Sequence, residues 1–410
     1  MDNCIIINIG QLVTCSGFAA KHGKAMSDLG IVENAAIVIT RGIITYAGPH
    51  SGSLPIDHSE DYTTIDADGN AVLPGFIDSH THFVFGGYRE EEFSWRMRGD
   101  SYMSIMNRGG GIYNTVRATR ETAFETLKSV SGKRLDKMLE MGVTTVEGKS
   151  GYGLDKATEL KQLRVKKELN KEHPVDIVST YLGAHAVPHD YTEKAYIDFM
   201  IREVLPGIRA ENVAECCDIF CEKDVFSVEE SRRFLLAAKE LGFRLKLHAD
   251  EIVHTGGAEL AAELGALSAD HLLHISEKGI QALANSQTVA TLLPCTAFSL
   301  KEDYAKGREM IDAGCAVALA TDLNPGSCFS SSIPLTIALA CIYMKMSPEE
   351  VVTALTINAA AALGKAGSIG SINVGKKGDL IVLEYPSYKF LPYNVGMNCV
   401  KTVIKSQKRI

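Results

Sequence analysis

The sequence lacks the features that mark membrane-spanning, secreted and nucleic-acid-binding proteins. No apolar run approaches the roughly 18–20 residues needed to cross a bilayer. The first residues, 1–11, include an acidic residue where a signal peptide would be basic. The 42 Lys and Arg and 50 Asp and Glu residues are interspersed, with a net charge of −8. Because phosphate neutralisation needs clustered cations, we expect a cytoplasmic protein that binds neither nucleic acid nor membrane.

Closely paired cysteines are also missing. The ten cysteines include no CxxC pair, and only Cys216, Cys217 and Cys221 lie near one another in the sequence. A structural zinc cage or a redox motif needs closely spaced thiols. We therefore expect most cysteines to be free, buried and kept in a reducing compartment.

The composition that is present is that of a globular protein. The 410 residues are 46% hydrophobic and 22% charged, which allows one large domain and a smaller one. Short β-branched runs separated by turn residues occupy both ends of the chain: 4–7, 36–40, 43–47, 381–383 and 400–404. They predict a small composite β-sandwich domain formed by residues 1–70 and 365–410.

Between the two ends the pattern changes to apolar runs that end in polar residues and are followed by helical stretches. This alternation is typical of parallel strands joined by crossover helices. We count eight such runs: 72–82, 143–149, 177–185, 216–222, 243–248, 268–273, 289–294 and 317–322. They predict an α/β fold, a (β/α)8 TIM-like barrel over residues 71–364, with catalytic side chains where the strands end.

Histidines and a carboxylate stand at the ends of several of these runs. His80 and His82 close the first run, and alternate residues of a strand point to the same side. His248 ends the fifth run and Asp322 the eighth. Any one of these residues alone would be interpreted as a hydrogen-bonded strand end. Together they predict a site for Zn2+ or Fe, because these metals accept nitrogen and oxygen ligands.

A hydrolytic metal site also needs groups that accept and donate protons. A metal-held water with a lowered pKa is a nucleophile, and the departing nitrogen must be protonated. The available groups are Glu251, His271 and Asp322. His271 ends the sixth run, where it could polarise a carbonyl. Glu251 qualifies only if its strand ends or bulges near Ala249, because strict alternation directs it away from the side of His248.

At this level of detail the chain resembles the imidazolonepropionase family of the amidohydrolase superfamily. The resemblance extends over nearly the whole length. It rests on eight segments: 80–89, 109–112, 115–120, 149–154, 182–185, 247–251, 269–271 and 321–327. The barrel pattern alone would indicate only the superfamily.

The resemblance implies hydrolysis of the ring C–N bond of 4-imidazolone-5-propanoate to N-formimidoyl-L-glutamate, in histidine degradation. It also implies a homodimer with one Zn2+ or Fe3+ per subunit, held by His80, His82, His248 and Asp322, and proton transfer by Glu251 and His271. The residues that it assigns to the small-molecule substrate or product are Arg89, Tyr152, His185, Glu251, Asn324, Gly326 and Ser327. A guanidinium and loop N–H groups suit a propionate carboxylate.

Three other interpretations remain open. A metal-dependent deaminase of a cyclic amidine or nucleobase-like substrate would use the same barrel and ligands. A binuclear enzyme with a carboxylated lysine fits less well, because Lys149 ends the second run while the fourth ends at Cys221 and Glu222. A non-catalytic assembly protein is opposed by the presence of all the candidate ligands.

Overall fold

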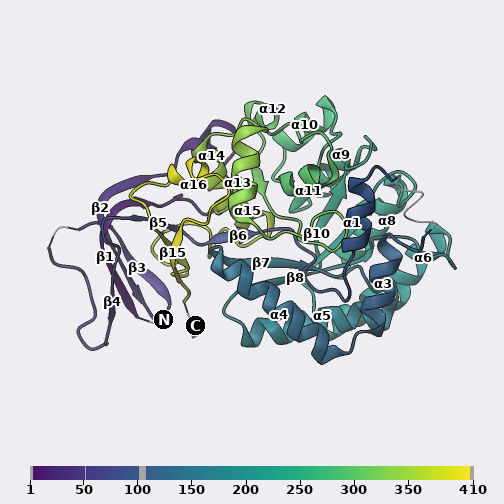
Figure 1. The fold of residues 1–410 in the computed structure, drawn as a ribbon, viewed down its shortest axis with the longest axis horizontal. Helices are drawn as coiled ribbons and strands as arrows, with labels where there is room; N and C mark the ends of the chain where they lie inside the picture. Colours follow the sequence, from purple (N-terminus) through teal and green to yellow (C-terminus); the bar gives the residue numbers. More distant parts are fainter. Residues whose placement is uncertain (1–2, 51, 101–107, 407–410) are drawn as a thin grey trace.

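The computed structural model describes residues 3–50, 52–100 and 108–406. Two sheets organise these residues, one built from both ends of the chain and one from its middle. In Figure 1 the first sheet lies at the left, and the second lies inside a layer of helices at the right.

The first sheet has seven strands. They are β1 (Cys4–Val13), β2 (Ile31–Thr40), β3 (Ile43–Pro49), β4 (Thr63–Asp66), β5 (Ala71–Pro74), β14 (Leu380–Leu383) and β15 (Val400–Ile404). Their order is β15-β14-β5-β1-β2-β3, with β4 also on β1. The pairing of β14 with β5 joins the two chain ends in antiparallel register. The small β domain predicted from both ends is confirmed, and hydrogen bonding joins its strands into one continuous sheet.

The prediction that 72–82 forms a single barrel strand is wrong. The run divides at Gly75. The strand before it, β5, pairs within the first sheet, whereas β6 (Phe76–Asp78) pairs with β7 (Val143–Lys149) of the second sheet. A Cβ atom at Gly75 would lie 2.3 Å from Cγ2 of Thr144. The chain therefore crosses from one sheet to the other where only a residue without a side chain fits.

The second sheet is the predicted barrel. Its eight strands run parallel in chain order: β6, β7 (Val143–Lys149), β8 (Asp176–Ala184), β9 (Cys216–Cys221), β10 (Arg244–Ala249), β11 (Ser268–His271), β12 (Val289–Leu292) and β13 (Val317–Leu319). The seam beyond β6 and β13 is bridged by main-chain hydrogen bonds. The N–H of Asp322 donates to the oxygen of His80 at 3.0 Å, and the N–H of His82 to that of Leu323 at 2.8 Å.

Helices follow the strands and cover the outside of the barrel (Figure 1). They are α4 (Phe124–Glu140), α5 (Lys156–Glu172), α6 (Glu193–Phe199), the π-helix η2 (Met200–Val204), α7 (Leu205–Glu211), α8 (Val228–Glu240), α9 (Gly257–Leu264), α10 (Glu277–Ala284), α11 (Pro294–Leu300), α12 (Gly307–Asp312), α13 (Ile333–Ile342), α14 (Pro348–Ala354) and α15 (Ile357–Ala362). The other helices of the described residues are the 3-10 helix η1 (Gly23–Ser27), α1 (Glu90–Met97), α3 (Ile112–Glu121) and α16 (Phe390–Tyr393). Within the described part of the chain, no helix combines the length and apolar composition that a membrane span requires.

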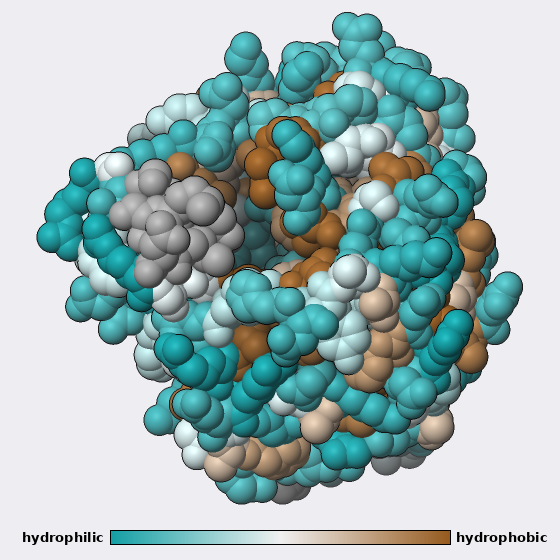
Figure 2. All heavy atoms as spheres, turned by 90° about the vertical axis from the view of Figure 1, so that its right-hand side faces the viewer, coloured by the Kyte–Doolittle hydropathy of each residue, from teal (hydrophilic) through white to brown (hydrophobic). Residues whose placement is uncertain are grey.

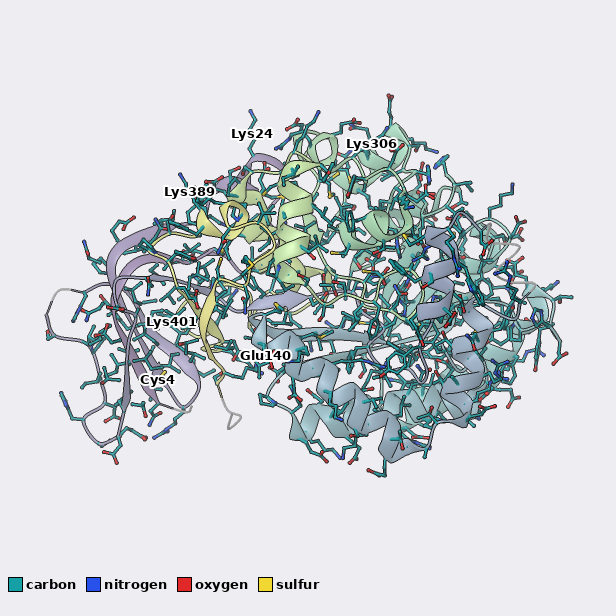
Figure 3. All side chains as sticks on the ribbon, viewed as in Figure 1. Cys4, Lys24, Glu140, Lys306, Lys389 and Lys401 are labelled. Atoms are coloured by element: carbon teal, nitrogen blue, oxygen red, sulfur yellow. The ribbon has the colours of Figure 1, made fainter. Side chains whose placement is uncertain are left out.

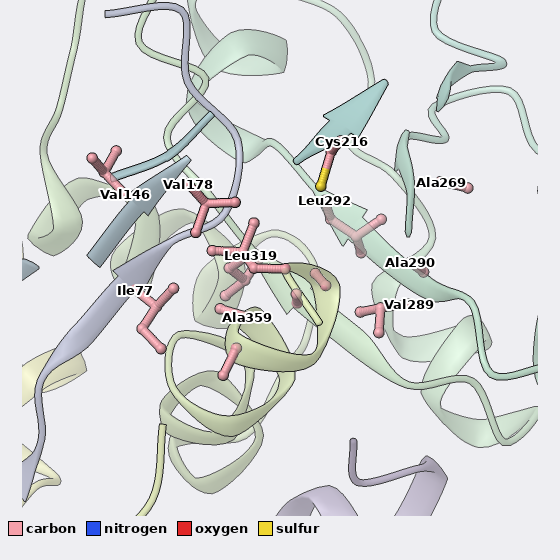
Figure 4. Close-up of a cluster of buried hydrophobic side chains, with 14 of the residues drawn as sticks. Ile77, Val146, Val178, Cys216, Ala269, Val289, Ala290, Leu292, Leu319 and Ala359 are labelled. Carbon is pink, nitrogen blue, oxygen red and sulfur yellow. The ribbon is translucent and has the colours of Figure 1, made fainter. Parts of the chain in front are cut away.

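Part of the hydrophobic core lies where α15 packs against β6, β12 and β13. Figure 4 shows Ile77, Val146, Leu319 and Ala359 among its buried side chains. All ten cysteines are free and nine are buried, as expected from their spacing.

The small sheet and the barrel meet along α4 and β15. The side-chain amide of Asn398 donates to the main-chain oxygen of Glu140 at 2.8 Å. Figure 3 places Glu140 and Lys401 of β15 on neighbouring parts of this boundary. Figure 2 shows a hollow on the face of the molecule that lies away from the small sheet.

Candidate metal centre and active site

The four predicted metal ligands meet at the carboxyl ends of the barrel strands. His80 and His82 follow β6, His248 lies in β10, and Asp322 follows β13. The Nε2 atoms of His80 and His82 lie 3.5 and 3.6 Å from Oδ1 of Asp322. The His80 and His248 ring centroids are 4.6 Å apart. All four side chains are buried.

Several of their polar atoms have no hydrogen-bond partner. These include Nε2 of His80, Nε2 of His248 and Oδ1 of Asp322. Buried polar atoms in proteins are nearly always paired, so this group has the composition and shape of a cation site. Three overlapping sets of ligand atoms lie within 4.8 Å of one another: His80, His82 and Asp322; His80, His248 and His271; His82, His185 and His248.

The electrostatic environment favours the metal-binding form of the three histidines. Burial is the largest cause that holds the pKa values of His80, His82 and His248 well below the ordinary range. For His80 and His248 the positive charge of Lys149 is the next cause, and for His82 it is the neighbouring imidazoles. Neutral imidazole is the ligating form of histidine. Burial raises the pKa of Asp322 to about 7. Its Oδ2 accepts a hydrogen bond of 2.7 Å from the Thr296 hydroxyl, which leaves Oδ1 for the centre.

Glu251 lies on the same side as the histidines because its strand stops. β10 ends at Ala249, and Asp250 has a φ of +50°, in the left-handed region. The strand therefore ends near Ala249, which is the condition under which Glu251 could take part in catalysis. Its Oε1 lies 3.4 Å from Nδ1 of His271, and its side chain keeps 16% of its surface exposed. Burial and then the charge of Asp322 raise the pKa of Glu251 to about 8, and burial lowers that of His271 to about 3.

Tyr152 and His185 line the wall beside His82. The His185 ring stacks on that of His82, with centroids 5.0 Å apart and an interplanar angle of 14°. Its Nδ1–H donates to the oxygen of Gly151 at 3.2 Å. The Tyr152 ring centroid is 5.7 Å from that of His82. Both residues therefore directly adjoin the candidate ligands.

Arg89 and the loop 324–327 lie further out, at the rim. The Arg89 guanidinium contacts Glu92 at 2.7 Å. A Cβ atom at Gly326 would lie 2.1 Å from Nη1 of Arg89, so the loop backbone and the guanidinium are in close contact. Oδ1 of Asn324 accepts the N–H groups of Gly326 and Ser327 at 2.9 and 2.8 Å, which shapes the loop.

A cavity of about 430 Å3 adjoins Arg89, Gly326 and Ser327, with Phe93 and Phe329 among its other lining residues. The histidines do not line it, so it lies beside the cluster and not over it. Figure 2 shows the face of the molecule that is at the right in Figure 1, with a hollow partly edged by hydrophobic residues. The structure thus places the predicted substrate residues in two groups, one against the histidines and one at the rim.

Sequence reasoning missed a layer of charged residues inside the barrel: Glu147, Lys149, Asp218, Lys246 and Asp270, all fully buried. Burial alone would lower the pKa of Lys149, but Asp218, Glu147 and Asp270 raise it above the ordinary value. Glu147 and Lys149 are two positions apart in β7 and so lie on the same face of the strand, and the same holds for Lys246 and His248 in β10. This period-two spacing of charges in apolar strands was the signal that could have found them.

Comparison with known proteins shows which folds and families the chain is similar to. The Amidohydrolase family model matches residues 233–410. An adenosine deaminase from Xanthomonas campestris with bound zinc shares the fold at a TM-score of 0.70 and 18% identity, covering 99% of this chain and 92% of that one. Guanine deaminase from E. coli aligns at a TM-score of 0.73 and 13% identity, covering 100% and 99%. The fold is that of a (β/α)8 barrel, and the carboxyl-terminal part of the chain is similar to the Amidohydrolase family, a similarity that implies a metal cofactor.

Closer relatives narrow the class to a family. The imidazolonepropionase of Parabacteroides distasonis is 65% identical over 409 residues, which cover 99% of this chain and 98% of the relative. That of Clostridium tetani is 61% identical over 405 residues, covering 98% and 97%. The chain belongs to the imidazolonepropionase family.

Proposed function

We propose that the protein hydrolyses the ring C–N bond of 4-imidazolone-5-propanoate to give N-formimidoyl-L-glutamate. Within the imidazolonepropionase family, one observation supports this proposal for the present chain. The cluster of His80, His82, His248 and Asp322 lies directly beside the Glu251–His271 pair, at the open end of the barrel. Relatives matched over nearly their full length support the choice of substrate.

We infer that the cluster holds one Zn2+ or Fe3+ per subunit. The unpartnered Nε2 atoms of His80 and His248 and Oδ1 of Asp322 support this assignment. The chemistry that such a cation supplies is the lowering of a water's pKa toward neutrality, which makes the water a hydrolytic nucleophile.

Glu251 and His271 are the groups proposed to handle protons and charge. Water adds to the ring carbonyl carbon, the bond from this carbon to the ring nitrogen breaks, and a proton passes to the departing nitrogen. Glu251, whose pKa is raised to about 8, exchanges protons readily near neutral pH and takes the proton of the water and delivers it. His271 stays neutral because burial lowers its pKa to about 3, so it stabilises the carbonyl oxygen by hydrogen bonding.

The remaining predicted residues are proposed to bind the substrate. Tyr152 and His185 lie against His82 and so adjoin the ring that reacts. Arg89 lies beside the backbone of Gly326, where its guanidinium can receive the propionate carboxylate. Ser327 shares this loop and hydrogen-bonds Asn324.

The direct test is an ultraviolet assay of freshly prepared imidazolonepropionate, with and without a chelator, with the product identified by mass. We expect decay to N-formimidoyl-L-glutamate that the chelator abolishes. Ammonia release from guanine, cytosine or adenine without turnover of the imidazolone would favour the alternative, a deaminase of a cyclic amidine or nucleobase-like substrate. Metal analysis that finds no Zn or Fe would favour the assembly role.

Two further expectations stay predictions. The family resemblance indicates a homodimer, which sedimentation of the purified protein will test. A cytoplasmic location is supported by free, largely buried cysteines, which suit a reducing compartment.

A further inference from the structure

A layer of buried charges lies directly beneath the proposed metal centre. Lys149 is its hub: its Nζ lies 2.6 Å from Oδ2 of Asp218, 3.1 Å from Oε2 of Glu147 and 3.3 Å from Oδ2 of Asp270. Lys246 lies 3.1 Å from the same oxygen of Glu147. All five side chains are fully buried, so water does not screen these contacts.

Two carboxylates of this layer also touch candidate metal ligands. Oδ2 of Asp270 lies 2.6 Å from Nδ1 of His80. Oδ2 of Asp218 lies 3.1 Å from Nδ1 of His248. The same oxygen atoms that contact Lys149 therefore face the two imidazoles. The contact at His80 is a hydrogen bond, and a carboxylate in this position fixes the ring's tautomer and turns Nε2 toward the opposite side, where a metal would lie. The contact at His248 is electrostatic, because Nδ1 of that ring makes no hydrogen bond.

The second oxygen of each carboxylate is held elsewhere. Oδ1 of Asp270 accepts the hydroxyl of Ser268 at 2.5 Å. Oδ1 of Asp218 accepts the main-chain N–H groups of Ile219 and His248 at 2.7 and 3.2 Å. Each carboxylate is thus anchored at one oxygen, and its other oxygen contacts Nζ of Lys149.

The charges of the layer do not cancel. Counted as fully ionised, three carboxylates and two ammonium groups have a formal net charge of −1 (two minus three). This charge complements a cation above it. Carboxylation of Lys149 would instead add an anion among three carboxylates, which argues against the binuclear alternative.

We propose that Lys149, through Asp270 and Asp218, is a positioning residue for the metal: it holds the two carboxylates that orient His80 and His248 with Nε2 toward the centre. This inference rests on the proposed function only in that a metal binds at the cluster. It assigns no contact with the substrate to these residues.

The test compares Asp270→Asn and Lys149→Met with Lys166→Met as the matched control. Lys166 is also fully buried, but its Nζ donates to the main-chain oxygens of Gly148 and Thr180 and to no carboxylate of the layer. The affinity for Zn2+ is measured by competition with a chromophoric chelator, and ligand geometry by the visible absorption spectrum of the Co2+-loaded proteins.

We expect Asp270→Asn and Lys149→Met to bind Zn2+ roughly 10–100-fold more weakly and to show an altered Co2+ spectrum, as outer-shell changes typically do. Lys166→Met should keep the wild-type affinity within about twofold, and its spectrum, even if it is less stable. If Lys149→Met does not fold, the nearly isosteric Asp270→Asn decides the matter.

A folded Asp270→Asn variant with wild-type Zn2+ affinity and spectrum would overturn the proposal. Failure of the proposed function would give a different result. The wild-type protein would then either bind no metal or bind a metal that His248→Ala does not remove. Equal weakening in Lys166→Met would also overturn it, because the effect would then be general loss of stability.

Discussion

Oε1 of Glu251 lies 3.4 Å from Nδ1 of His271, and the two side chains come from the ends of adjacent strands, β10 and β11. Glu251→Gln keeps the size of this side chain but removes its ability to carry a proton. We expect the variant to keep its metal and to lose at least about 100-fold in kcat, since general acid–base catalysis contributes that much. Steady-state kinetics with metal analysis check this. A near-normal kcat would return Glu251 to a structural role.

His248→Ala should remove metal and activity together, because it deletes an imidazole from the centre of the cluster. His274→Ala is the matched control: His274 is exposed and lies outside the metal-ligand sets. Elemental analysis of proteins purified without added metal makes the comparison. Full metal content in His248→Ala would contradict the assigned ligand set.

Arg89→Ala is expected mainly to raise KM, by roughly 10–100-fold, because a hydrogen bond to a charged group contributes about 1.5–3 kcal/mol. Arg117→Ala, an exposed arginine on α3, should leave KM unchanged. Initial rates over a range of substrate concentrations separate KM from kcat. An unaltered KM in Arg89→Ala would mean that this residue does not contact the carboxylate.

Gly75→Ala should destabilise the protein by about 1–3 kcal/mol, as overpacking does, because its Cβ would collide with Thr144. Gly367→Ala is the control, since nothing lies within 4 Å of a Cβ atom there. Urea unfolding followed by circular dichroism measures both. Equal midpoints would show that the crossing between the sheets adjusts without cost.

Lys166 predicts a pH dependence of stability. Burial lowers its pKa from the ordinary 10.5 to about 7. Between these values the unfolded chain binds more protons than the folded one, so this group makes stability rise with pH, by up to about 1.4 kcal/mol per unit. Relative to Lys166→Met, the wild-type protein should gain urea resistance from pH 7 to pH 9, at fixed metal concentration. Parallel pH profiles for the two proteins would refute the shifted pKa.

Local patterns were enough to predict much of the architecture. Each of the eight apolar runs contains a strand of the barrel, and the short runs at both chain ends form the small sheet. Alternation along a strand also predicted that His80 and His82 share a side, because this geometry depends only on neighbouring residues. The division of the first run, 72–82, was not predicted, because nothing local shows that two sheets share it across Gly75.

By itself the sequence determined the fold class, the family and the residue types at the strand ends, because apolar periodicity and motif spacing are properties of the chain alone. Only the tertiary structure decided that a left-handed turn at Asp250 brings Glu251 to His271, and that Lys149 joins Asp218 and Asp270 beneath the histidines. Those contacts join residues up to 121 positions apart. They arise when the barrel closes and buries charges that then need partners, and no local pattern records that requirement.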